Sequence, residues 1–263
     1  MVVHLIAGGS DGDQAAEGDF LDKHARYDRQ EEYLTILRRV WNEEKPFSHK
    51  GTHYTFDNFI AGVKPIKKIP ISVGGSSPDA YRVGGALADI FGLWGEPLKE
   101  TKEQIDRVYA EAEKAGRNDR PRIWVTFRPI LAPTEELAWA KAHETLDRLN
   151  ANSGKSSAFR PNGNEKDKAP QNVGSQRLLD IAARGEVQDR ALWYPTVQAT
   201  GARGASTALV GSPQTIIDSI IDYVKLGADL ISIRGYDNLN DAIDYGRYIL
   251  PGVRAELVKQ GLN

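Results

Sequence analysis

Short runs rich in β-branched residues alternate along this chain with longer amphipathic segments. Strands are predicted for the runs Val2–Ala7, Ile69–Val73, Asp89–Trp94, Arg122–Leu131 and Asp229–Arg234. Strands that alternate with helices indicate βα units, in which each helix carries the chain back so that successive strands run parallel. The sequence therefore predicts an α/β fold built on a parallel sheet.

Helices are predicted where apolar residues recur every three or four positions. Three such stripes are Leu34, Leu37, Val40 and Trp41; Ile105, Val108, Tyr109 and Ala112; and Ile216, Ile217, Ile220, Ile221 and Val224. Ser212 and Pro213 precede the last stripe, and serine followed by proline is typical of a helix start. Gly51–Phe56 is predicted to be a short strand or one arm of a hairpin.

Composition excludes several classes of function. The 263 residues contain no cysteine, so disulfides, thiolate metal sites and cysteine nucleophiles are excluded, and no metal site is expected. The formal net charge of −2, from 34 basic and 36 acidic residues, does not favour nucleic-acid binding. No apolar run is long enough to span a membrane. The first residues, MVVHLIAGG, lack the pattern of a signal peptide, so a cytoplasmic location is expected.

One long polar segment interrupts the alternation. Residues Asn150–Ser175 are rich in Ser, Asn, Gly, Lys and Pro, and they contain few side chains that a core could bury. Two interpretations fit this composition. The segment is either a disordered surface loop or a mobile lid over an active site, because long loops in compact enzymes often close over the site.

The turn after the strand at Ile69–Val73 has the residues of an anion site. Gly74 and Gly75 let the backbone approach a ligand closely, and Ser76 and Ser77 add hydroxyl donors before a helix that begins near Pro78. Free N–H groups at a helix start attract phosphate. A plain strand-to-helix turn with a serine cap has the same residues, so this pattern alone does not decide between the two.

Six segments together carry a resemblance: VHLIAGGSD from Val3, FLDKHARYDRQEEYLTILRRVW from Phe20, PISVGGSSPDA from Pro70, LWGEP from Leu93, GASTALVG from Gly204 and RGYDNLNDA from Arg234. In order and spacing they resemble the luciferase-like flavin-dependent monooxygenases, specifically the alkanesulfonate monooxygenase branch. The resemblance implies a (β/α)8 TIM barrel with the flavin at the carboxyl ends of the strands. The resemblance also implies that residues 1–263 form a single domain.

The resemblance also implies that the barrel is partial. Family chains carry three further strands before the one that here starts at Val2. The predicted strands would then be the fourth to the eighth of the barrel, and the domain would be incomplete at its N-terminus. The missing strands build one wall of the family's flavin pocket.

The family's cofactor-binding residues can be carried over by motif. Gly75, Ser76 and Ser77 would hold the phosphate of FMN, and Ser10 and Tyr27 would line the same flavin. Members bind reduced FMN (FMNH2) made by a separate NAD(P)H:FMN reductase, and they react it with O2 to form a C4a-peroxyflavin. This species oxidises a small substrate, and the sulfonate-cleaving members release sulfite and an aldehyde. An assembly of identical chains is expected.

The expected catalytic residues are Tyr236, Arg203 and Arg128. Tyr236 matches a tyrosine near the reacting centre, and Arg203 lies close to the position of a lid arginine. The sulfonate enzymes carry an Arg-x-His pair at the positions that here hold Thr126 and Arg128, so the substrate of this chain is left open. Arg128 and Arg234 could supply positive charge to a sulfonate, or they could form surface salt bridges.

Two alternatives stand beside a flavin monooxygenase. The first is an oxidoreductase of the same superfamily that uses the deazaflavin F420 and transfers hydride. The second is a non-catalytic remnant of the barrel that serves only as a subunit or binding partner.

Overall fold

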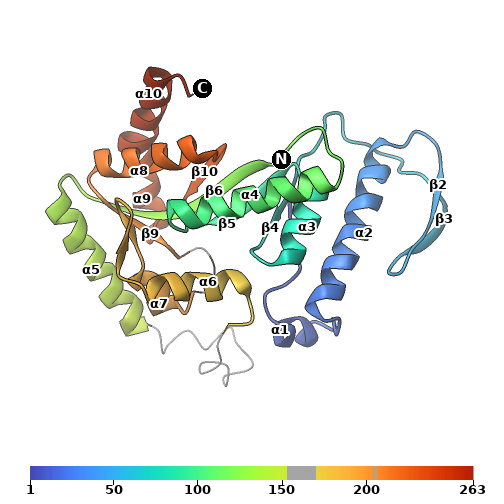
Figure 1. The fold of residues 1–263 in the computed structure, drawn as a ribbon, viewed down its shortest axis with the longest axis horizontal. Helices are drawn as coiled ribbons and strands as arrows, with labels where there is room; N and C mark the ends of the chain where they lie inside the picture. The colour runs from blue at the N-terminus through green and yellow to red at the C-terminus, as the bar shows by residue number, and fades with distance from the viewer. Residues whose placement is uncertain (153–169, 203, 205, 263) are drawn as a thin grey trace. The chain divides into compact units, whose positions relative to one another are not determined.

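The computed structural model describes residues 1–152, 170–202, 204 and 206–262. The chain divides into two compact units, Met1–Gly92 with Asp106–Arg122, and Leu93–Ile105 with Ile123–Asn263 (Figure 1). Both contain parallel strands connected by helices, as the alternation in the sequence predicts. Among the described residues of either unit, the strands do not close into a barrel.

The sheet of the first unit contains the parallel strands β1 (Val3–Leu5), β4 (Ile71–Gly74) and the start of β5 (Ile90–Trp94). His4 lies beside Ser72, and Gly74 lies beside Gly92. The predictions for these three strands are confirmed, with ends that differ by up to two residues. The carboxyl ends of β1 and β4 therefore lie at the same edge of the sheet, where ligands bind in α/β folds.

Helices connect these strands. They are α1 (Asp11–Ala16), α2 (Lys23–Asn42), α3 (Pro78–Leu87) and α4 (Leu98–Lys114), of which the last begins in the second unit. A Cβ on Gly84 would lie only 2.3 Å from the ring of Phe91, so glycine lets α3 pack directly on β5. The ring of Tyr81 stacks on Phe91 at 5.8 Å. Arg26 and Tyr27 lie inside α2 and are buried.

A hairpin of β2 (Phe47–Lys50) and β3 (Thr55–Phe59) lies beside α2 (Figure 1). The prediction of a strand over Gly51–Phe56 is partly wrong, because Gly51–Tyr54 form the turn between the two strands. Glu32 of α2 holds this turn. Its carboxylate accepts hydrogen bonds from the backbone N–H groups of His53 and Tyr54 at 2.9 and 3.0 Å.

The second unit is built on β6 (Arg122–Leu131), whose bounds match the prediction. The first half of β6 pairs in parallel with β10 (Leu230–Ile233), and the second half pairs in parallel with β9 (Ala208–Gly211). Two short antiparallel strands follow β9 in the sheet, β8 (Leu192–Trp193) and β7 (Val187–Gln188). The five predicted strands do not include β7, β8 or β9, so the predicted number of strands in the sheet is corrected.

The helices of the second unit are α5 (Glu135–Asn152), α6 (Val173–Ala182), α7 (Pro195–Thr200), α8 (Pro213–Leu226), α9 (Asn238–Asp244), the π-helix η2 (Tyr245–Ile249) and α10 (Leu250–Gln260). The predicted start of α8 is confirmed, because the Ser212 hydroxyl accepts from the N–H of Thr215. Trp193 is fully buried against Ala138 and Ala142 of α5. These contacts fix α5 against the short strands.

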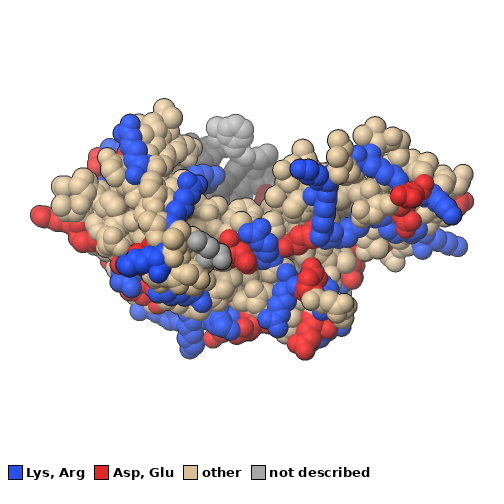
Figure 2. Space-filling model, turned by 90° about the horizontal axis from the view of Figure 1, so that it is seen from above, with Lys and Arg blue, Asp and Glu red and all other residues tan. Residues whose placement is uncertain are grey.

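The polar segment Asn150–Ser175 is bounded by helices. Helix α5 continues to Asn152 and α6 begins at Val173, capped by Asn172. The predicted mobile loop therefore lies mainly at residues 153–169, which are outside the described residues. Among the described helices, none is long and apolar enough to cross a membrane. On the face drawn in Figure 2, basic and acidic side chains alternate over short distances, in line with the net charge of −2.

Candidate functional site

The turn after β4 has the geometry of an anion site in the first unit. Ser77 caps α3, with its hydroxyl accepting from the N–H of Ala80 at 3.2 Å, and Pro78 is in the first turn of the helix. Ser76 is partly buried and Ser77 is buried. Gly75 has a φ of +140°, which L side chains rarely adopt. The turn therefore combines a glycine at positive φ with a capped helix start, two features that are also found in phosphate sites.

Tyr27 of α2 lies directly beside this turn. A Cβ added to Gly75 would be 3.0 Å from the Tyr27 hydroxyl and 2.8 Å from the Cβ of Ala80. The hydroxyl forms a hydrogen bond with Ser77, and burial raises the pKa of Tyr27, so the phenol is neutral. The structure thus brings together three of the expected cofactor-binding residues: Tyr27, Gly75 and Ser77.

Charged residues surround the start of α3. The Asp79 carboxylate lies in the first turn and would repel an anion, but the His24 ring contacts it at 2.9 Å and Arg82 at 3.5 Å. The hydrogen bond and the charge of Asp79 raise the pKa of His24, which favours the protonated ring. Protonated His24 and Arg82 therefore both lie beside Asp79, although Arg82 also pairs with Asp28 at 2.7 Å and with Glu31.

Ser10 follows β1 and lies at the start of α1. Its hydroxyl caps α1 by accepting from the N–H of Asp13 at 3.2 Å. Arg26, which is 2% exposed, fixes this region through the carbonyl of Ala7 at 2.7 Å and the carboxylate of Asp11 at 2.8 Å. Ser10 is thus positioned on α1, after the end of β1, with its hydroxyl engaged in the cap.

A second cluster lies in the second unit. The guanidinium of Arg128 lies over the Tyr236 ring, and it donates to the carbonyl of Gly235 at 3.2 Å. The Tyr236 hydroxyl is 3.4 Å from the carbonyl of Ser206 and forms a hydrogen bond with Thr196. Burial raises the pKa of Tyr236, so this phenol is neutral at ordinary pH. Arg128 and Tyr236 are therefore brought together as expected from the sequence.

Positive charge gathers at this cluster. Burial lowers the pKa of Arg128, and the positive charge of Arg234 lowers it further. A bound anion would be attracted by both charges and would accept hydrogen bonds from Arg128. Thr126, on the same strand as Arg128, is instead paired with Ser232 of β10 at 2.9 Å between hydroxyl oxygens. The third expected catalytic residue, Arg203, lies outside the described residues.

A buried network that the sequence analysis did not single out follows β5. Glu96 is 1% exposed, and its carboxylate accepts two hydrogen bonds from Arg177 of α6 at 2.9 and 2.6 Å. The Glu96 carbonyl accepts from the hydroxyls of Thr101 and Tyr223 at 2.9 and 2.6 Å. The burial of Glu96 raises its pKa despite the contact with Arg177. In the sequence, Glu96 lies in the LWGEP segment, which contributed only to the family resemblance.

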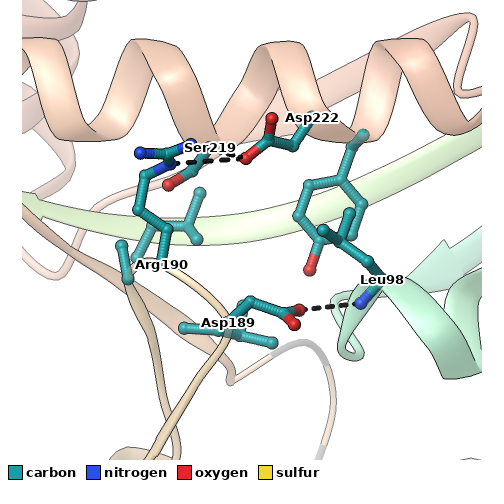
Figure 3. A pocket seen from close by; sticks show the side chains of 9 residues that line it. Leu98, Asp189, Arg190, Ser219 and Asp222 are labelled. Carbon is teal, nitrogen blue, oxygen red and sulfur yellow. Dashed lines mark hydrogen bonds and ion pairs between the residues drawn. The ribbon is translucent and has the colours of Figure 1, made fainter.

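A small pocket in the second unit has structural contacts on its walls (Figure 3). The Asp189 carboxylate accepts from the N–H of Leu98 at 2.8 Å and so caps α4, and Arg190 pairs with Asp222 at 3.3 Å. These polar groups already satisfy one another. The pocket is accounted for by packing between α8 and the short strands, and we assign it no ligand.

Comparison with known proteins gives one family match: a sequence profile described as luciferase-like monooxygenase matches residues 1–230. Among solved structures, DmoA from Hyphomicrobium sulfonivorans is similar at 18% identity and a TM-score of 0.71, over 98% of this chain and 61% of that chain. Riboflavin lyase with modified FMN and its substrate riboflavin is similar at 19% identity and a TM-score of 0.70, over 95% of this chain and 61% of that chain.

A third similar structure is an F420-dependent secondary alcohol dehydrogenase in complex with an F420-acetone adduct. It has 17% identity and a TM-score of 0.65, over 96% of this chain and 69% of that chain. These identities establish similarity of fold. The chain spans about three fifths of the length of DmoA and of riboflavin lyase, at 61% of each.

Proposed function

Because the chain belongs to the luciferase-like monooxygenase family, we propose that it serves in the oxidation of a small organosulfur compound by O2, with reduced FMN as the cofactor. The observation that carries this proposal is the turn at Gly75–Ser77, where positive φ, a helix start and the Tyr27 hydroxyl converge. Such a turn matches the requirements of a phosphate group.

The residues of the turn fit the phosphate end of FMN. Glycine at position 75 lets the turn pack closely against Ala80 and the Tyr27 hydroxyl, and the phosphate would lie at the capped start of α3. Ser76 would donate its hydroxyl to a phosphate oxygen, and protonated His24 would offset the charge of Asp79. When bound, the reduced flavin supplies the electrons that activate O2.

Arg128 and Tyr236 fit the role of substrate-binding residues. The guanidinium of Arg128, held over the Tyr236 ring, favours an anionic substrate such as a sulfonate, and Arg234 adds positive charge to this region. The neutral Tyr236 hydroxyl can donate a hydrogen bond, and its ring holds Arg128 in place. Thr126 occupies the position where the sulfonate enzymes carry the arginine of their Arg-x-His pair. We therefore propose that Arg128 carries the positive charge on this strand.

The cofactor has one alternative with a specific observation in its favour. One of the similar structures is F420-dependent, and F420 chemistry is transfer of hydride. The riboflavin lyase structure contains a modified FMN, which favours FMN equally at the level of fold. A reductase that supplies reduced FMN, and an assembly of identical chains, complete the proposal as partners.

Titration separates the cofactors. Purified protein is titrated anaerobically with reduced FMN and with reduced F420, and the affinities are read from the change in protein fluorescence. Tighter binding of reduced FMN, followed by O2-dependent release of sulfite from an alkanesulfonate, is the expected result. Preferential binding of F420 without O2 consumption would instead favour the hydride-transferring alternative.

A further inference from the structure

We propose that the first unit contains a second ligand site, in a cleft between the end of β1 and helix α2, which binds an uncharged aromatic amide. The cleft is lined by Leu5, Ile6, Ala7, Gln14, Arg26, Arg29, Gln30, Tyr33 and Tyr54. None of these residues belongs to the turn at Gly75–Ser77 or to the cluster at Arg128. The cleft therefore shares no lining residue with the site of the proposed function.

Gln30 is the observation that points to a ligand. This side chain is 6% exposed, and neither its amide nitrogen nor its amide oxygen has a hydrogen-bond partner among the described residues. A buried polar group without a partner costs stability, so native proteins pair nearly all of them. The Gln30 amide offers a donor and an acceptor side by side, which a carboxamide or lactam edge would match in one planar contact.

The charges of the cleft favour a neutral ligand. Both cationic side chains in the wall are already paired with carboxylates, Arg26 with Asp11 at 2.8 Å and Arg29 with Asp19. The guanidinium of Arg26 also donates to two backbone carbonyls, at 2.7 and 2.6 Å. The cations of the wall are therefore already neutralised by carboxylates. Among the described residues of this wall, Gln30 is the one whose buried side-chain amide lacks a partner.

The other walls of the cleft favour an aromatic ring. The rings of Tyr33 and Tyr54 lie 6.2 Å apart with a tilt of 50°, within the range of aromatic contacts. Tyr33 lies one helical turn from Gln30 in α2 and is 40% exposed, so its ring forms part of the outer wall of the cleft. Leu5 and Ala7 add apolar surface beneath. An aromatic ring that carries an amide matches both the tyrosines and the unpaired glutamine.

The test uses the full chain, with benzamide as the probe and benzoate as its charged counterpart. The side-chain NH2 resonance of Gln30 is assigned by its loss in Gln30→Leu and followed during the titration. We expect benzamide to shift this resonance, and Gln30→Leu to weaken benzamide binding about tenfold, the effect of one or two lost hydrogen bonds. Benzoate should bind at least about tenfold more weakly than benzamide, because a carboxylate cannot donate to the amide oxygen.

Two further measurements serve as controls. Gln176→Leu, a change at an exposed glutamine of α6, should leave benzamide affinity unchanged. In the absence of ligand, Gln30→Leu should leave the melting temperature unchanged or raise it, because it removes an unpaired buried amide. The proposal would be overturned if the wild type and Gln30→Leu bound benzamide equally well. It would also be overturned if the Gln30 amide contacted only an internal water, or if Gln30→Leu were markedly destabilised.

Discussion

The guanidinium carbon of Arg128 lies 5.3 Å from the centre of the Tyr236 ring, although 108 positions separate the two residues in the chain (236 minus 128). An arginine held in this way is pre-oriented, so it loses little side-chain freedom when it binds an anion. The ring contact also explains how a half-buried guanidinium is kept in place beside a second cation, Arg234.

Replacing Arg128 with glutamine tests this role. Arg128→Gln removes the charge but keeps an amide donor, and we expect kcat/KM for an anionic substrate to fall by at least about tenfold, the effect of a lost charge-assisted hydrogen bond. Arg190→Gln is the matched control, because Arg190 is half exposed and pairs with Asp222 on the surface. Steady-state sulfite release measures both variants, and equal losses in the two would contradict the assignment.

The space at Gly75 gives a second prediction. Gly75→Ala should weaken FMN binding and lower the free energy of unfolding, because its Cβ meets Ala80 and the Tyr27 hydroxyl in addition to the strain of positive φ. Gly18→Ala carries only the strain, about 1–3 kcal/mol, since nothing lies within 4 Å of that Cβ. Urea unfolding and FMN titration compare the two. A Gly75→Ala variant that is no less stable than Gly18→Ala and binds FMN normally would refute the packing argument.

The contact between His24 and Asp79 predicts a pH dependence. The folded-state pKa of His24 is raised above its ordinary 6.5, so its stabilising contribution is present below that value and is lost as the pH rises through the folded-state pKa. Deprotonation also leaves Asp79 less compensated at the start of α3. FMN affinity should therefore fall as the pH rises through this range, and His24→Gln should remove that fall. If FMN affinity depends on pH in His24→Gln as it does in the wild type, another titrating group is responsible and the prediction is wrong.

The buried pair Glu96–Arg177 predicts a large effect on stability. Arg177→Met leaves a carboxylate that is 1% exposed without its partner, and such variants lose about 3–5 kcal/mol of unfolding free energy. Burial already raises the pKa of Glu96, so the loss should grow as the pH rises through that raised value and Glu96 ionises.

The double variant Glu96→Gln with Arg177→Met serves as the control for this pair. It should recover most of the lost stability, because no buried charge remains. Urea unfolding at acidic and at mildly basic pH provides the measurement. Arg177→Met with wild-type stability at both pH values would show that the pair is not needed for the fold.

The long strand β6 was predictable, and its neighbours in the sheet were less so. Arg122–Leu131 is ten residues long and rich in apolar and β-branched residues, which is sufficient to specify a strand. The strands β7 and β8 have two residues each, which is too short for a period-two pattern to be recognised, whereas β9 has the same length as β4 and was still not predicted. Their strand conformation is set by pairing with neighbours, which sequence periodicity does not record.

The contacts of the candidate sites were likewise predictable only where they are local in the sequence. The cap at Ser77 is local, because its partner Ala80 is three residues away, and the sequence offered it as one of two interpretations of this turn. The pairing of Glu96 with Arg177 joins residues 81 positions apart, and the unpaired amide of Gln30 depends on which side chains surround it. Tertiary contacts of this kind have no local signature, so they emerge only from the structure.

Binding of reduced FMN to variants of the turn after β4 tests the central claim most directly. Ser76→Ala with Ser77→Ala removes both hydroxyls, and Ser212→Ala removes the equivalent serine–proline cap of α8 far along the chain. Anaerobic titration should show FMN affinity at least about tenfold lower in the double variant, unchanged in Ser212→Ala, and riboflavin affinity similar in all three proteins. A folded double variant that binds reduced FMN as tightly as the wild type would contradict the assignment of this turn to the phosphate.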